Sequence, residues 1–303
     1  MIAAFFSLFL LLGAGIAYRW IRNVPPPSDV RRIIGSIVLN IFLPALTFHV
    51  LYTAPETTDL IAVPAVSIVT ILGTAALAWL VYGMLLRKRL AGPTIGALIL
   101  AAAWCNATYL GLPVTAAMIG DHVRRVPVLF DLLGMSPMLF TLGTLIAVEY
   151  GTKGKRHTIG EALRQIATLP PLVAAIAGIT LNLLDVPLPD AIGQACEMAG
   201  RCVAPLMIFA VGLALRPPQW KILPWTLPSV GIKLVVAPLL ASPLVHLWIA
   251  DPDVLRATML EAGMPTMVLT MVFAERYGLD EAILAQTILV GTVVSMLTLP
   301  YLV

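Results

Sequence analysis

Charged residues are scarce in this sequence. They make up 12% of its 303 residues, whereas hydrophobic residues make up 59%, and the mean hydropathy is +0.95. A soluble globular domain has about 25% charged residues. A chain with so little charge is difficult to keep in water, so we expect an integral membrane protein with the bilayer as its solvent.

The motifs of soluble enzymes and metal sites are also missing. The sequence has no Walker loop, no Gly-x-Ser-x-Gly and no His-Glu-x-x-His. Its cysteines, Cys105, Cys196 and Cys202, lack the spacing of a disulfide framework or a zinc site. We therefore expect no enzymatic activity, no cofactor and no nucleic-acid partner.

No basic residue precedes the first apolar stretch. Arg19 and Arg22 follow it instead, whereas a cleaved signal peptide carries its positive charge first. We interpret this stretch as a transmembrane helix whose N-terminus lies outside.

The sequence contains apolar segments of about 20 residues, the length that crosses a bilayer. Ten of them are joined by short polar links, at 3–20, 33–52, 60–85, 94–119, 126–150, 165–183, 191–215, 223–249, 254–274 and 282–301. With the N-terminus outside, the inner links hold fourteen of the 19 Lys and Arg residues, and the outer links hold only Arg124, Arg125 and Arg256. This asymmetry obeys the positive-inside rule, so the sequence predicts ten spans with both termini outside.

Ten spans divide into two halves of five, 1–150 and 151–303, with opposite orientations, which is the inverted-repeat arrangement of many secondary transporters. Weak sequence similarities between the two halves support this division. Asn40 and Arg201 each stand four residues before a proline, and Gly111-Leu112-Pro113 in the fourth segment matches Gly263-Met264-Pro265 in the ninth. The sequence therefore predicts an all-α membrane protein with 5+5 inverted repeats and broken fourth and ninth helices.

Gly-x-Pro motifs break helices because proline removes a backbone donor and glycine loosens the chain beside it. Unpaired backbone groups are costly in lipid, so such breaks persist inside protein or around a polar cavity. If the fourth and ninth helices cross at their breaks, half-helix ends can bind an anion and freed carbonyls a cation. The alternative, that each motif is only a packing kink, stays open.

Charged residues at two places within the apolar segments are candidates for function. Glu261 precedes the break in segment 254–274, and an intramembrane carboxylate is a candidate functional group. It can bind sodium or carry a proton, or it can pair with Arg256 near the surface. Glu197 lies four residues before Arg201 on one helix, so the two can pair. Arg201 can instead bind a carboxylate with its planar guanidinium.

Two further charged residues have structural interpretations. Lys233 can extend its long side chain back to the inner surface, and we favour a structural role, although it can also neutralise Asp131 or the substrate. Asp131 lies close to Arg125 in sequence, and a surface pair between them accounts for it.

The stretches NATYLGLPV (106–114), FLPALTFHVLYTAP (42–55) and EAGMPTMVLTMVFAERYGLD (261–280) resemble the auxin efflux carrier family. The short link at 151–160 is similar to its prokaryotic members. The resemblance spans nearly the whole chain. It implies a carrier of organic anions in a bacterial inner (plasma) membrane, with dicarboxylates such as malonate or malate as substrates.

The family's fold is similar to that of the bile acid/sodium symporters. The resemblance implies a scaffold of helices 1, 2, 6 and 7, through which a homodimer can form, and a mobile transport domain of helices 3–5 and 8–10. The matching positions imply a substrate site at Asn106, Gly111, Pro113, Gly263 and Pro265, with Asn40 and Arg201 on the facing scaffold. Glu261-Ala-Gly-Met264 resembles a sodium-binding stretch of the symporters and implies an ion site at Glu261, Asn106 and Met264. Met118 stands five residues after Pro113, at a position where the plant carriers have a polar residue.

The leading hypothesis is a secondary transporter of a small organic anion, a mono- or dicarboxylate, that works by elevator-type alternating access. One alternative is a sodium- or proton-coupled symporter of a larger, bile-acid-like amphipathic acid. The other is a membrane sensor that transports nothing.

Overall fold

The computed structural model describes residues 2–54, 59–153, 164, 167–214 and 219–302. Within these residues the chain is helical and has no β-strand. Among them, six helical segments are long and apolar enough to cross a bilayer: Pro27–Tyr52, Asp59–Leu85, Asp121–Tyr150, Asp190–Leu213, Leu223–Trp248 and Glu281–Tyr301. Shorter apolar helices are Gly92–Ala103, Ala107–Met118 and Pro170–Leu183. This architecture confirms the all-helical membrane fold at the level of its elements.

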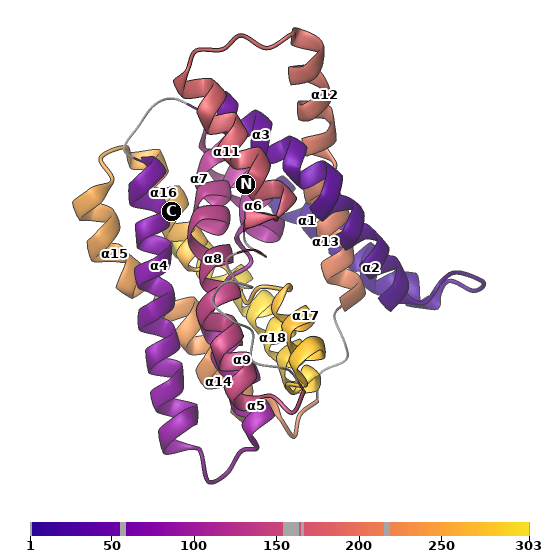
Figure 1. Ribbon diagram of the computed structural model, residues 1–303. Helices are drawn as coiled ribbons and strands as arrows, with labels where there is room; N and C mark the ends of the chain where they lie inside the picture. The colour runs from indigo at the N-terminus through magenta and orange to yellow at the C-terminus, as the bar shows by residue number, and fades with distance from the viewer. Residues whose placement is uncertain (1, 55–58, 154–163, 165–166, 215–218, 303) are drawn as a thin grey trace.

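The first half of the chain contains several long helical segments (Figure 1). The helix type changes along many of them. Its first helical segment consists of α1 (Ile2–Ala17) and η1 (Tyr18–Trp20). The second consists of α2 (Pro27–Ile37), η2 (Val38–Phe42) and α3 (Leu43–Tyr52). The next are α4 (Asp59–Ala78) with η3 (Trp79–Leu85), and α5 (Gly92–Ala103), followed by η4 (Ala107–Gly111) and α6 (Leu112–Met118). The last comprises η5 (Asp121–Val123), α7 (Arg125–Leu129), η6 (Phe130–Met135), α8 (Ser136–Met138), η7 (Leu139–Gly143) and α9 (Thr144–Tyr150).

The described part of the second half includes α11 (Pro170–Leu183). After it, α12 (Asp190–Arg201) and α13 (Val203–Ala214) form one long helical segment. It continues with α14 (Leu223–Gly231), η8 (Ile232–Val236) and α15 (Ala237–Trp248), then α16 (Pro252–Ala262), α17 (Thr270–Tyr277), α18 (Glu281–Thr298) and η9 (Leu299–Tyr301). Within the predicted segment 165–183, Pro170 and Pro171 start α11, and residues 164 and 167 before them are also helical. Proline is well suited to the first helical turn, where no backbone donor is needed. Most of the 151–160 link lies outside the described residues.

Local sequence signals account for several helix ends. Asp251 accepts hydrogen bonds from the amides of Asp253 (2.8 Å) and Val254 (3.2 Å) and so caps α16. Asp280 caps α18 through the amide of Ile283 at 3.1 Å. Gly278 ends α17 in the left-handed region, with φ of 69°, which glycine adopts without strain.

One group of helices is held together by close backbone approaches. α1 packs along α13, and α3 packs along α11. A Cβ added to Gly15 would lie 2.3 Å from the carbonyl oxygen of Phe209, and one added to Gly178 would lie 2.7 Å from that of Phe48. Small residues that allow such contacts are typical of membrane helix interfaces.

A second group surrounds α5, which is buried from Ile95 to Ala103. α5 contacts α4, α9, α14 and α18. Ser229 of α14 donates its hydroxyl to the carbonyl of Leu98 at 2.9 Å, and Tyr82 donates to the carbonyl of Trp225 at 2.9 Å. These buried bonds hold α5 and η3 against α14.

Candidate functional site

Two interrupted helices meet at their interruptions. α5 ends at Ala103 and the next helix starts at Ala107, while α16 ends at Ala262 and α17 starts at Thr270. The non-helical residues pair as an antiparallel bridge between Cys105 and Thr266. The Asn106 amide donates to the Pro265 carbonyl at 2.7 Å, and the Met267 amide donates to the Trp104 carbonyl at 2.9 Å. We call this region the crossing.

The first break does not lie where the Gly-x-Pro motif predicts it. The helix continues through Gly111 and Pro113, and the chain is non-helical at Trp104–Asn106 instead. Pro113 is accommodated because the turn before it, Ala107–Gly111, is a π-helix, whose wider spacing absorbs a proline. In the second break the prediction and the structure agree, since Gly263 caps α16 and Pro265 lies in the non-helical stretch.

Most of the backbone carbonyls freed at the crossing already have partners. Thr266 donates its hydroxyl to the carbonyl of Ala101 at 2.8 Å. The carbonyl of Glu261 accepts the amide of Met264 at 3.1 Å and the thiol of Cys105 at 3.1 Å. Backbone groups of each break therefore form hydrogen bonds with the other break. This explains how the two non-helical stretches persist in an apolar interior.

The Glu261 side chain is the polar group at the crossing that remains unmatched. It is 0% exposed, and among the described residues neither carboxylate oxygen has a hydrogen-bond partner. A Cβ added to Gly111 would lie 2.2 Å from Oε2 and 2.5 Å from Oε1. The carboxylate thus occupies space that only glycine leaves free. An isolated buried carboxylate is costly, so this position suits a proton or a bound cation.

Other predicted site residues lie in the two breaks: the Asn106 amide donates to the Pro265 carbonyl, and the Met264 amide donates to the Glu261 carbonyl. Asn106 is 3% exposed and Met264 is 0% exposed. Pro113 lies in α6, beyond the π-helical turn that follows the crossing, and is half-buried. The structure thus brings together Glu261, Asn106, Gly111, Gly263, Met264 and Pro265.

Asp131 is a buried neighbour of the crossing and not a surface residue. Its carboxylate accepts hydrogen bonds from the hydroxyls of Thr108 and of Ser136 (3.0 Å). Arg125, its expected partner, instead donates to the carboxylate of Asp59 at 2.9 Å. The predicted Asp131–Arg125 pair is therefore wrong, because the two side chains, six residues apart, face different helices.

The structure excludes two alternatives that the sequence left open for charged residues. Lys233 is 1% exposed in η8, so its ammonium group does not extend to the surface. It interacts electrostatically with Glu261, as does Asp131. Arg256 lies 3.7 Å from Asp253 and does not pair with Glu261. Sequence reasoning missed Thr108, although it stands two residues after Asn106 in the same motif.

Asn40 and Arg201 lie away from the crossing. The Asn40 side chain is exposed and donates to the carbonyl of Ser36 at 2.8 Å. Arg201 pairs with Glu197 at 2.6 Å, as the helical spacing predicts, and 70% of its side chain is exposed. The structure brings neither residue to Glu261.

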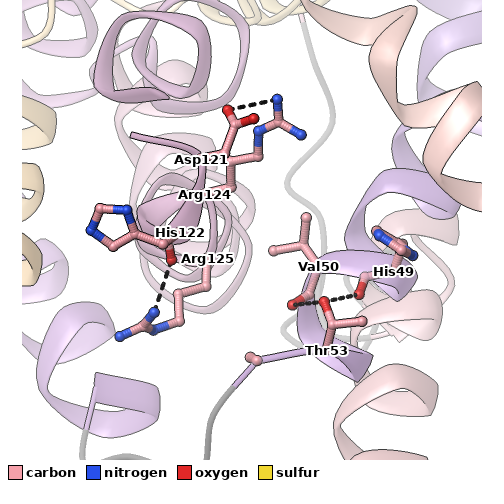
Figure 2. A pocket seen from close by; sticks show the side chains of 8 residues that line it. His49, Val50, Thr53, Asp121, His122, Arg124 and Arg125 are labelled. Atoms are coloured by element: carbon pink, nitrogen blue, oxygen red, sulfur yellow. Dashed lines mark hydrogen bonds and ion pairs between the residues drawn. The ribbon is translucent and has the colours of Figure 1, made fainter. Parts of the chain in front are cut away.

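A cavity of about 320 Å³ lies between α3 and the turn that leads into α7. Figure 2 shows His49, Val50 and Thr53 on one side and Asp121, His122, Arg124 and Arg125 on the other. Within the described residues, no three His, Cys, Asp or Glu side chains are grouped so as to hold a metal ion, here or elsewhere.

Comparison with known proteins connects the chain with transporters. The family described as "Membrane transport protein" matches residues 2–303. An uncharacterized transporter of Methanothermobacter thermautotrophicus is 29% identical over 273 residues, which cover 88% of this chain and 86% of the relative. A protein of Rhizobium meliloti named "Putative malonate transporter" is 27% identical over 310 residues, which cover 98% of this chain and 92% of the relative.

Proposed function

Because this chain belongs to the membrane transport protein family, the family of the auxin efflux carriers, we propose that it is a secondary transporter of a small organic anion. The relatives are named as transporters, and one name specifies malonate. We propose a mono- or dicarboxylate of that size as the substrate. The sequence has no nucleotide-binding motif, so transport draws on a gradient.

The observation that carries the proposal is the unpaired Glu261 carboxylate, buried at the crossing against Gly111. A sodium ion, as a hard cation, prefers oxygen ligands of this kind. A proton would neutralise the same group. Either would remove the cost of a buried negative charge.

The crossing also offers a place for the anion. The helix Ala107–Met118 begins there, and the first amides of a helix have no acceptor within it. Such amides, with the helix dipole, attract anions. An ionised Glu261 beside them would repel a carboxylate. Cation binding removes that repulsion, so cation and anion bind together, which is the physical basis of symport.

For the motion, we propose ten spans in two inverted repeats and an elevator mechanism. The helices that pack through glycine contacts, α1 with α13 and α3 with α11, would form the scaffold. The crossing and the helices around α5 would move against it and carry the bound ions past the scaffold residues Asn40 and Arg201. The contacts within each group support this division: α1 with α13 and α3 with α11 in one, and α5 with α4, α9, α14 and α18 in the other.

The test is uptake of radiolabelled malonate into proteoliposomes under an inward sodium or proton gradient. We expect one gradient to drive uptake, and Glu261→Gln to abolish the dependence on it. Glu275→Gln, at an exposed position, is the matched control and should transport normally. If none of a series of mono- and dicarboxylates is taken up by folded protein under either gradient, the proposal is wrong.

A further inference from the structure

The cavity between α3 and α7 has features of a second binding site, separate from the crossing. Its volume of about 320 Å³ is in the range of small-molecule sites. Two arginines and two histidines line it, against one carboxylate, Asp121. The wall on the side of α3 is completed by Val50, Thr53 and Ala54. This lining favours a small anion over a cation.

Most of the cationic side chains in this lining are already engaged. Arg125 donates to Asp59 at 2.9 Å and to the carbonyl of His122 at 3.0 Å. The ring of His122 lies 3.0 Å from the carboxylate of Asp253. In Figure 2 the His122 ring and the Arg125 guanidinium point away from α3. These two residues therefore hold the wall in place and are not free to bind a ligand.

Arg124 differs from them. Its Nη2 lies 2.8 Å from the carboxylate of Asp121, whose side chain is 73% exposed. Its Nε is buried and, among the described residues, has no hydrogen-bond partner. A buried donor without an acceptor is costly, and an exposed ion pair contributes little. An incoming carboxylate can therefore compete with Asp121 for the guanidinium group, and a shift of the Arg124 side chain would give it the Nε–H as a second donor.

The cavity lies where the two helix groups meet. α3 belongs with α11, whereas α7 contacts α4, α16 and η4. Glu197 of α12 interacts electrostatically with both His49 and Arg124. An anion bound here would contact both groups.

We propose that this cavity is a docking site for a small carboxylate, which Arg124 binds through its Nε–H in competition with Asp121. The site rests on the proposed function for its ligand class. It differs from the crossing in position and in residues. Its role is to hold the anion at the junction of the two helix groups.

The test places a reporter in the cavity. Thr53 is exposed there, so Thr53→Cys, in a chain with Cys196→Ser and Cys202→Ser, can be modified by a maleimide in the purified protein. We expect malonate to slow the modification and choline to leave it unchanged. Arg124→Gln should raise the malonate concentration needed for protection about tenfold, since a charge-assisted hydrogen bond is lost.

Two further variants give the test a direction. Asp121→Asn removes the competing carboxylate, and we expect it to lower the required malonate concentration about two- to fivefold. Arg256→Gln removes the same charge outside the cavity lining, where Arg256 pairs with Asp253, and should have no effect. If Arg124→Gln unfolds the chain, Arg124→Lys and Asp121→Asn carry the test, and Arg124→Lys should also weaken protection.

The proposal is overturned if malonate fails to slow the modification, or if Arg124 and Asp121 variants protect like the parent. Phosphate of a lipid headgroup shares the chemistry of a carboxylate. If protection by malonate is present in phosphatidylcholine nanodiscs but disappears with phosphatidylglycerol, the cavity is a lipid site and the proposal is also wrong. Protection without any uptake in proteoliposomes would retain the docking site and reject the transport function; uptake without protection would do the reverse.

Discussion

Gly111 and Glu261 depend on each other at the scale of single residues. The carboxylate of Glu261 lies in the space of the missing Gly111 side chain, 2.2 Å from where a Cβ would stand. Asp131 and Lys233 are also buried nearby and interact electrostatically with Glu261. Two carboxylates and one ammonium group leave an excess of negative charge if all are ionised, which one bound cation or proton would neutralise.

We predict that Gly111→Ala displaces the Glu261 carboxylate and removes the cation dependence of transport. The added methyl group overpacks a buried site, which costs about 1–3 kcal/mol of folding free energy. Uptake under sodium and proton gradients measures the first effect, and thermal unfolding in detergent measures the second.

Gly231→Ala is the control for this prediction, because a Cβ at Gly231 meets nothing within 4 Å. It should keep the cation dependence and lose no stability. A Gly111→Ala protein with unchanged cation dependence would show that Glu261 is not the coupling group.

Helix interruptions and helix contacts are the features that matter at the scale of elements. Proline and glycine indicate that a helix is disturbed, but they do not specify where the chain leaves the helix. Gly111 ends a π-helical turn and Pro113 follows in α6, so both stay helical, and the break falls at Trp104–Asn106, which has neither residue type. The antiparallel bridge to Pro265 and Met267 stabilises that extended stretch.

We predict that Gly15→Val separates α1 from α13, because the new side chain would meet the carbonyl oxygen of Phe209, a backbone atom that cannot move aside cheaply. The free energy of unfolding should fall by about 1–3 kcal/mol or more. Thermal unfolding and the yield of folded protein in size-exclusion chromatography measure it.

Gly13→Val on the same helix is the matched variant, since a Cβ at Gly13 has no neighbour within 4 Å. Equal losses in the two variants would mean that the α1–α13 contact does not hold the helices together.

The distribution of charge determines orientation at the scale of the whole molecule. The turn between α4 and α5 carries Arg87, Lys88 and Arg89, whereas Asp251 and Asp253 lie at the start of α16. In Figure 1 the α4–α5 turn and the start of α16 lie at different levels of the molecule. The positive-inside rule predicts that the basic turn faces the cytoplasm.

We predict that Lys88→Cys is modified by a membrane-impermeant maleimide only from the cytoplasmic side, and Asp251→Cys only from the outside. Both positions are exposed. Cys196→Ser and Cys202→Ser remove the partly exposed native thiols, and Cys105 is buried. Labelling of intact cells and of inverted vesicles distinguishes the sides. Modification of both positions from one side would contradict the ten-span topology.

The sequence by itself determined that this is a helical membrane protein and that Glu261 and the residues around it merit attention. Hydropathy and charge are properties of each stretch of the chain. Membrane spans and their orientation can therefore be predicted from the sequence alone. Glu261 was recognisable because a carboxylate within an apolar segment is costly wherever its helix packs.

Only the tertiary structure decided which groups meet. It placed Glu261 against Gly111, paired Arg125 with Asp59 and buried Lys233. It also formed the cavity beside Arg124 from two stretches some seventy residues apart in sequence. Such contacts depend on how helices rotate and pack against one another. The residue pattern of one helix does not specify which face of another helix it will contact.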